Sequence, residues 1–302
     1  MKKITDIWKG YLFAILATVA ISNVYIFSKA ALNEVHLSQF GMYWFGIAIL
    51  CNLLYSFSSG RYRKFKNIET SHFKIFLGIG IIEIIATVSM FVAIDKIPNP
   101  SVPSFLRNLE PIFIVFLAFI ILKEKYNFIE KIGIVLTIIG ATIISYKSGD
   151  GFFTLFIDGV QYMVIACFFY AIRTVWVKHV IKKIDPLILN LNKLVFLFVA
   201  FIIYFMFSDV GFIISKFALI NIIIGAIIGP FFTSYAQYLA LQYIDASRAT
   251  LLQSTAGIFT LGFAYLYFGS LPLFYQIIGG LITIIGIWIL IDGKRLINLK
   301  MN

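Results

Sequence analysis

The chain alternates long apolar segments with short polar ones from one end to the other. A helix needs about 20 mainly apolar residues to cross the hydrocarbon of a bilayer. Ten segments meet this requirement, and we therefore predict an all-α integral membrane protein with ten transmembrane helices. The expected spans are Gly10–Ala31, Leu37–Phe57, Phe73–Ile94, Ser101–Leu122, Phe128–Tyr146, Phe153–Val177, Pro186–Phe207, Ala218–Leu241, Ala246–Phe268 and Leu273–Ile291.

The last two spans belong to one apolar stretch, Ala249 to Ile291, which contains no charged residue. This stretch is too long for a single crossing. The sequence GSLP at Gly269–Pro272 is typical of a turn, so we expect two helices that meet there.

The composition agrees with a membrane protein, because 61% of the residues are hydrophobic and only 13% are charged. Soluble domains average about 25% charged residues. Cys51 and Cys167 both fall in apolar segments, which indicates neither a disulfide framework nor a cysteine metal site. The first apolar segment is not followed by a small-residue cleavage site, so we expect it to stay as the first span.

The distribution of basic residues predicts the orientation. Of the 25 Lys and Arg residues, only Lys29, Lys96, Lys147 and Lys216 fall in the loops opposite the termini. By the positive-inside rule both termini are expected to be cytoplasmic, in a multi-pass protein of the cytoplasmic membrane. We attribute the net charge of +11 to basic residues in the cytoplasmic loops, where they set the topology and contact anionic lipid. We therefore expect no nucleic-acid partner.

An internal repeat appears at an offset of 147 residues. AIDKIPNPSV (93–102) matches ALQYIDASRA (240–249) in pattern, and VLTIIGATII (135–144) matches LITIIGIWIL (281–290) after a slip of one residue. Five spans are therefore used twice, and an odd number of spans makes the second copy enter the membrane inverted. Carriers that alternate access around a midplane site have this architecture. The predicted five-helix repeats are residues 1–150 and 151–302.

Two motifs in the first copy resemble those of one transporter family. Ser22–Asn23 followed by Lys29 resembles G-S-N-F-x-x-x-K, with Ile21 in place of the glycine. NLEPIF followed by LKEK resembles L-x-P-V-F…L-G-E, with Pro111 and Glu124 at the matching places.

The second copy carries two further motifs. YAIRTVW resembles W-A-x-x-T-V, with Tyr170 for the tryptophan and Arg173 where a neutral residue is usual. IDASRATLLQSTAGIF keeps the small residues with which this span of the family begins, and Gly257–Ile258 stand near the positions of the usual proline and glutamate. With the ten spans and the duplication, the whole chain resembles an EamA-type carrier of the drug/metabolite transporter superfamily.

The resemblance implies a ten-helix bundle around a central cavity, lined by spans one, three, four, six, eight and nine. Spans five and ten would pack at the back. Both carry small residues that let helix backbones approach closely, namely Gly133, Gly140, Gly279, Gly280 and Gly286. Members of the family often release amino acids or related compounds.

Four ionisable residues are predicted well inside spans: Glu83, Arg107, Glu110 and Arg173. Such groups cost at least about 2.5–3.5 kcal/mol at a helix centre, so they usually face the bundle interior or a wet cavity. Two interpretations remain open. The four groups bind substrate, or they pair with one another and join helices. Arg173 and Lys193 also lie near the ends of their spans, from which they would reach the interface, and we favour that placement for Lys193.

Glu83 is our candidate for proton coupling, because a carboxyl group in a poorly solvated cavity binds and releases protons more readily near neutral pH. Glu110 is the competing candidate. The second copy has no charge at the corresponding positions: Arg107–Asn108 match Ser254–Thr255, Glu83 matches Pro230 and Glu110 matches Gly257. The full set of predicted substrate-binding residues is Asn23, Tyr25, Glu83, Thr87, Ser104, Arg107, Asn108, Glu110, Tyr170, Arg173, Ser234, Gln237 and Gln253.

The sequence favours a transporter over an enzyme or a channel. The three histidines, His36, His72 and His179, fall in loops or at span ends, and no nucleophile stands with a base. We therefore expect no catalytic residue, no metal and no cofactor. The predicted function is a secondary transporter of a small polar metabolite, first an amino acid, moving outward with proton coupling. The alternative is an exchanger or importer of a nucleotide-like or sulfonium metabolite such as S-adenosylmethionine. The expected partners are the substrate, protons and the lipid bilayer, with the chain a monomer or homodimer.

Overall fold

The computed structural model describes residues 4–60, 73–122, 127–147, 156–180, 184, 186–244 and 246–300. These residues form helices, apart from loops and one isolated antiparallel bridge between Tyr146 and Phe156. The predicted repeat boundary at residue 150 and the motif residue Glu124 lie outside the described residues. Uninterrupted helices are α1 (Ile4–Leu32), α2 (Leu37–Ser58), α3 (Phe73–Lys96), α6 (Phe128–Ser145), α7 (Val160–Val180), α8 (Pro186–Met206) and α13 (Phe274–Lys300).

Three predicted spans are interrupted helices. The first consists of α4 (Ser101–Leu106), the 3-10 turn η3 (Arg107–Leu109) and α5 (Glu110–Leu122). The second consists of α9 (Lys216–Ala226), the π-helical segment η5 (Ile227–Thr233) and α10 (Ser234–Tyr243). The third consists of α11 (Ala246–Ser254) and α12 (Ala256–Phe268).

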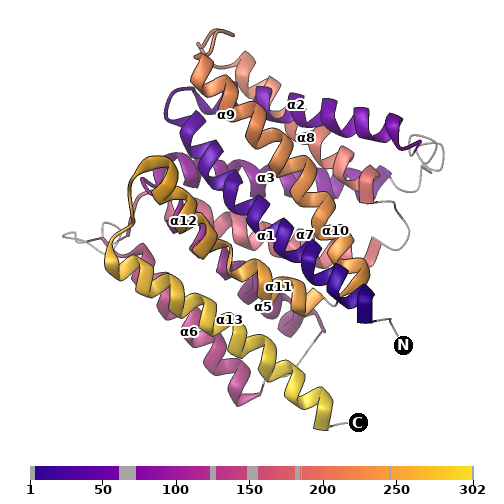
Figure 1. Ribbon diagram of the computed structural model, residues 1–302, viewed down its shortest axis with the longest axis vertical. Helices are drawn as coiled ribbons and strands as arrows, with labels where there is room; N and C mark the ends of the chain where they lie inside the picture. The colour runs from indigo at the N-terminus through magenta and orange to yellow at the C-terminus, as the bar shows by residue number, and fades with distance from the viewer. Residues whose placement is uncertain are drawn as a thin grey trace.

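The chain is a multi-pass membrane protein. Among the described residues, nine stretches are long and apolar enough to cross a bilayer, and they correspond to all the predicted spans except Ser101–Leu122. Large apolar side chains such as Leu54, Phe128 and Leu266 are exposed on the outside of the bundle, where lipid would cover them. Figure 1 shows the helices lying side by side, with both ends of the chain at the same end of the bundle.

One predicted helix start is wrong. Span six was expected from Phe153, but α7 begins at Val160. The preceding residues turn instead: Gly159 has a left-handed φ of +105°, and the amide of Ile157 donates to the carbonyl of Ser145. A Cβ at Gly159 would lie 2.9 Å from Lys96 Cβ, so this turn needs glycine both for its conformation and for its close packing.

Pro111 contributes to the interruption before α5. Proline has no amide hydrogen, so the carbonyl of Arg107, four residues earlier, loses its usual helical donor. The amide of Glu110 donates to this carbonyl instead, which gives the 3-10 geometry of η3. The thiol of Cys167 on α7 adds a contact from the neighbouring helix, with Sγ 3.9 Å from the Arg107 oxygen and 3.6 Å from the Leu106 oxygen.

Pro230 lies in the π-helical segment η5, which interrupts a helix of the second half of the chain. Thr233 Oγ1 donates to the carbonyl of Ile228 at 2.9 Å, and Asn190 on α8 donates to the carbonyl of Pro230 at 3.2 Å. Side chains thus bind two backbone carbonyls of this irregular segment, as suits a segment inside a membrane.

Interruptions in the two copies meet in the centre of the bundle. At the offset of 147 residues, Arg107 in η3 corresponds to Ser254 at the end of α11. Asn108 Nδ2 donates to the Ser254 carbonyl at 3.2 Å, and Ser104 Oγ lies 2.8 Å from Thr260 Oγ1. The two interrupted helices are joined by hydrogen bonds where the sequence repeat makes them equivalent.

Helices α6 and α13 form a close pair at the edge of the bundle (Figure 1). A Cβ added at Gly140 would lie 2.6 Å from the carbonyl oxygen of Gly279, and one at Gly286 would lie 2.7 Å from the amide of Thr137. The backbones therefore touch directly, as the glycines in both spans predict.

Apolar side chains close the end of the bundle at which the α1–α2 loop lies. Leu32, Val35, Ile94 and Ile97 are buried there. Deeper in the bundle, the rings of Phe40 and Phe91 lie 4.8 Å apart by their centroids. We interpret this packing as a closed end of the bundle.

Candidate functional site

A cavity of about 70 Å³ lies in the centre of the bundle, several times the space that one water molecule needs. Its wall comes from α1, α2, α3, η3, α7, α8, η5 and α10, so both halves of the chain contribute. The polar residues of the wall are Thr87, Arg107, Tyr170, Arg173, Lys193, Thr233, Ser234 and Gln237. The apolar residues include Trp44, Phe45, Met90 and Phe91.

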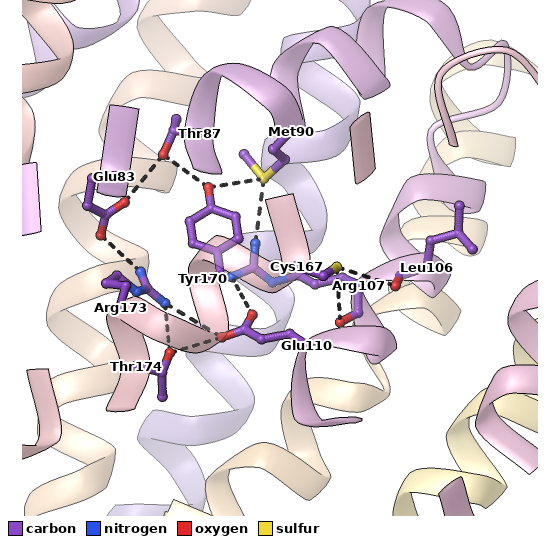
Figure 2. A network of polar contacts seen from close by, with 10 residues as sticks. All are labelled: Glu83, Thr87, Met90, Leu106, Arg107, Glu110, Cys167, Tyr170, Arg173 and Thr174. Atoms are coloured by element: carbon purple, nitrogen blue, oxygen red, sulfur yellow. Dashed lines mark hydrogen bonds and ion pairs between the residues drawn. The ribbon is translucent and has the colours of Figure 1, made fainter. Parts of the chain in front are cut away.

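The intramembrane charges form a continuous chain of ion pairs (Figure 2). Arg107 Nη2 lies 3.3 Å from Glu110 Oε2. Arg173 Nη1 lies 3.1 Å from Glu83 Oε1, and its Nη2 lies 3.8 Å from Glu110 Oε1. Arg173 thus joins a carboxylate on α3 to one on α5. In this conformation the four groups pair with one another, which is the second of the two interpretations that the sequence left open.

Tyr170 holds both arginines in place. Its ring lies 4.6 Å from Arg107 Cζ and 4.9 Å from Arg173 Cζ, measured to the ring centroid. A guanidinium over an aromatic ring is attracted by about 0.5–2 kcal/mol. The ring stands where the resembling motif has a tryptophan, and Arg173 follows three residues later on the same helix.

Side chains of α3 hold Tyr170 and Glu83 in position. Thr87 Oγ1 donates to Glu83 Oε2 at 3.3 Å and lies 3.1 Å from Tyr170 Oη. Met90 Sδ lies 3.6 Å from Tyr170 Oη and 3.5 Å from Arg107 Nη1. Because Glu83, Thr87 and Met90 follow at steps of three to four residues, one face of α3 supports the whole cluster.

Thr174 adds a neutral contact to the same chain of charges. Its Oγ1 donates to Glu110 Oε1 at 3.0 Å, and Arg173 Nη2 lies 3.4 Å from that hydroxyl. Glu110 therefore accepts from a hydroxyl as well as facing two guanidinium groups. Each carboxylate has several partners, which is what ionised groups need inside a membrane.

Lys193 on α8 lines the cavity. We favoured a position at the membrane interface for this side chain, but the structure directs it into the bundle. Lys193 interacts electrostatically with Glu83, yet its ammonium nitrogen lies more than 4.0 Å from every carboxylate oxygen of the described residues. Helix rotation explains the difference, because distance from a helix end does not determine which face a residue occupies.

The predicted site residues fall into three groups. Thr87, Arg107, Tyr170, Arg173, Ser234 and Gln237 line the cavity. Glu83 and Glu110 lie behind the arginines that they bind. The others, Asn23, Tyr25, Ser104, Asn108 and Gln253, are not part of the described cavity wall.

Three residues of the third group, those outside the cavity wall, have structural partners. Asn23 Nδ2 donates to the carbonyl of Val19 within α1. Ser104 and Asn108 join α4 and η3 to the second copy, and Asn108 also donates to Thr283 Oγ1 at 3.1 Å. These contacts suit packing, and a role in binding would require another conformation. Tyr25 is buried, and its hydroxyl makes no hydrogen bond with the described residues.

Sequence reasoning did not place Lys193 or the rings of Phe45 and Phe91 in the site. Thr233 and Trp44 are different, because the sequence indicates both: Thr233 belongs to the neutral polar segment that contains Ser234, and Trp44 is an aromatic residue in a span with polar residues. The two phenylalanines carry no such signal, since 32 phenylalanines are spread over the whole chain. Within the described residues, no cluster of His, Cys, Asp and Glu has the composition of a metal site.

Comparisons with known proteins give consistent matches. The model of the EamA-like transporter family matches residues 8–146 and, separately, residues 157–292. The uncharacterized transporter YdfC of Bacillus subtilis (strain 168) is 22% identical over 225 residues, which cover 70% of this chain and 67% of YdfC. A solved crystal structure, described only as that of a protein, aligns with a TM-score of 0.67 and 14% identity over 95% of this chain and 98% of the other. At that identity the likeness concerns the fold alone.

Proposed function

Because the chain belongs to the EamA-like transporter family, we propose that it is a secondary carrier whose substrate binds in the central cavity. The observation that carries this proposal is the composition of the cavity wall. Charged side chains at membrane depth, from both halves of the chain, surround one small space. Intramembrane ionisable groups mark substrate and ion pathways, and a site between repeats is typical of carriers.

Two repeats, residues 1–150 and 151–302, would enter the membrane in opposite orientations and move against each other around the cavity. The hydrogen bond between Asn108 and Ser254 at the interrupted helices supports this view, because it lies where equivalent positions of the repeats meet. We propose that the protein lies in the cytoplasmic membrane with both termini in the cytoplasm, and the distribution of basic residues supports that orientation. The closed end of the bundle would then face outward, and the described conformation would be closed to the outside.

The substrate we propose is a small polar metabolite, with an amino acid as the first candidate. A charged group would meet the arginines and lysine of the wall, while Ser234 and Gln237 would offer neutral hydrogen bonds. Apolar walls with a few placed polar groups describe small-molecule sites. An exchanger of a nucleotide-like or sulfonium metabolite is the second candidate, favoured by the rings of Trp44 and Phe91 in the wall, on which a flat or cationic body would pack.

Export coupled to protons completes the proposal. Glu83 is the coupling candidate, because it is buried and bound to Arg173. A proton on Glu83 would remove the charge that holds Arg173 and so free its guanidinium for another partner. Glu110 shares the same arginine at 3.8 Å, so the pair would respond together.

Transport by the purified protein in liposomes tests this function. Vesicles loaded with one unlabelled amino acid at a time are placed in the same amino acid with a label, and counterflow is recorded. We expect labelled substrate to accumulate transiently, which a simple channel does not produce. An imposed pH gradient should accelerate export by the wild type and have no effect on Glu83→Gln. Absence of counterflow for amino acids, nucleosides and sulfonium compounds alike would contradict the proposal.

A further inference from the structure

We infer that the cavity recognises a small organic anion of net charge −1 through its carboxylate, and that Lys193 is the residue that binds this group. The inference rests on the proposed carrier function and deepens it, since it selects, among small polar metabolites, an anion in place of a zwitterionic amino acid. The structural basis is one positive charge that remains after the other charges of the site are paired.

The charge count starts from the ion-pair chain. Arg107 and Arg173 face Glu110 and Glu83, with N···O distances of 3.3 and 3.1 Å. Two cations and two carboxylates compensate each other, and both guanidinium groups are further held by the ring of Tyr170. These four groups present no net charge to a ligand.

Lys193 adds a fifth charge to the same space. Its side chain lines the cavity, and the described residues offer it no carboxylate within ion-pair distance. Glu83, the acid with which it interacts, already binds Arg173 and Thr87. An ammonium group at membrane depth is costly unless it is paired, so an anionic ligand would be held strongly here.

The other residues of the cavity wall determine which chemical groups the rest of the ligand can carry. The wall contains three cations, Arg107, Arg173 and Lys193, while neither carboxylate belongs to it. A ligand ammonium would therefore meet cations and find only neutral acceptors such as Ser234 and Gln237. The volume of about 70 Å³ suits a short molecule. A small carboxylic acid with hydroxyl or amide groups satisfies all these features.

The test compares ligands of equal shape and different charge. Binding to the purified wild-type protein in nanodiscs of zwitterionic lipid is measured by calorimetry for L-lactate against lactamide, and for glycolate against glycolamide, with L-alanine as a zwitterion and L-lysine as a cation. Lactate and glycolate should bind at least about tenfold more tightly than their neutral isosteres, since a charge-assisted contact is worth that much. This comparison needs no variant.

Variants then assign the effect to the lysine. Lys193→Met should reduce the affinity for lactate or glycolate by about tenfold and bring it to that of the neutral isostere, whereas Lys193→Arg should keep the preference. Lys131→Met is the matched control, because Lys131 is an exposed residue on α6, away from the cavity. Its binding should equal that of the wild type.

The outcomes separate this inference from the carrier function. Equal or tighter binding of the neutral isosteres or of lysine would overturn the inference and leave the carrier in place, and so would an undiminished charge preference in Lys193→Met. Absence of binding by every ligand, together with absence of counterflow, would overturn both.

Discussion

The guanidinium of Arg107 lies over the ring of Tyr170, with 4.6 Å between Cζ and the ring centroid. Tyr170 comes from α7, and Arg107 comes from the interruption between α4 and α5. The contact therefore connects the second half of the chain to the charged segment of the first. Arg173 lies over the same ring at 4.9 Å, so one aromatic side chain positions both arginines of the cavity.

Tyr170 gives the first prediction. Tyr170→Phe keeps the ring and loses only the hydroxyl contacts to Thr87 and Met90, so its thermal stability should fall slightly. Tyr170→Leu loses the ring as well and should be destabilised by about 2–3 kcal/mol, from cavity formation and the lost cation–π contacts. Thermal unfolding of both variants in one detergent measures the difference. Equal melting temperatures would show that the ring does not stabilise the arginines.

The pair of Glu83 and Arg173 gives the second prediction. Replacing one member leaves a buried charge without its partner, which costs about 3 kcal/mol. Glu83→Gln and Arg173→Gln should each lower the melting temperature by several degrees. The double variant should be less destabilised than the sum of the two, by about 0.5–3 kcal/mol. Strictly additive effects would mean that the 3.1 Å contact contributes nothing to stability.

The glycines between α6 and α13 give the third prediction. Gly140→Ala places a methyl group 2.6 Å from the Gly279 carbonyl oxygen, so the two helices must separate and the close packing is lost. We expect a lower melting temperature and a lower yield of folded protein. Gly262→Ala is the control, because a Cβ there meets no atom within 4 Å, and it should behave as the wild type. Equal behaviour of the two variants would contradict the packing assigned to this pair.

The positions of the helices followed well from the sequence, since hydrophobic length decides what crosses a membrane. The predicted span Leu37–Phe57 and the observed α2, Leu37–Ser58, differ by one residue at one end. The interruption at Arg107 was not predicted. Pro111 alone does not determine it, because prolines occur in continuous transmembrane helices whose freed carbonyls find other partners. Here the amide of Glu110 donates to the Arg107 carbonyl, and the thiol of Cys167, which is distant in sequence, lies 3.9 Å from the same oxygen.

The sequence predicted which charged residues belong to the site and that they lie at membrane depth. Intramembrane charge identified Glu83, Arg107, Glu110 and Arg173 as a group, because such charges are rare and must face the protein interior. Which of them pair, and that Lys193 joins them, depends on how each helix is rotated about its axis. That rotation follows from packing between helices, and a local pattern of residues does not specify it.

Substrate protection of Ser234→Cys tests most directly that the central cavity is the transport site. Ser234 lines the cavity, so a membrane-impermeant, thiol-specific sulfonate reagent should modify the new cysteine and abolish counterflow, and the transported substrate should slow that modification. The parent chain, with Cys51 partly buried and Cys167 buried, and Ser59→Cys at the exposed end of α2 should keep transport after the same treatment. Modification of Ser234→Cys without loss of transport, or with no protection by substrate, would contradict the account.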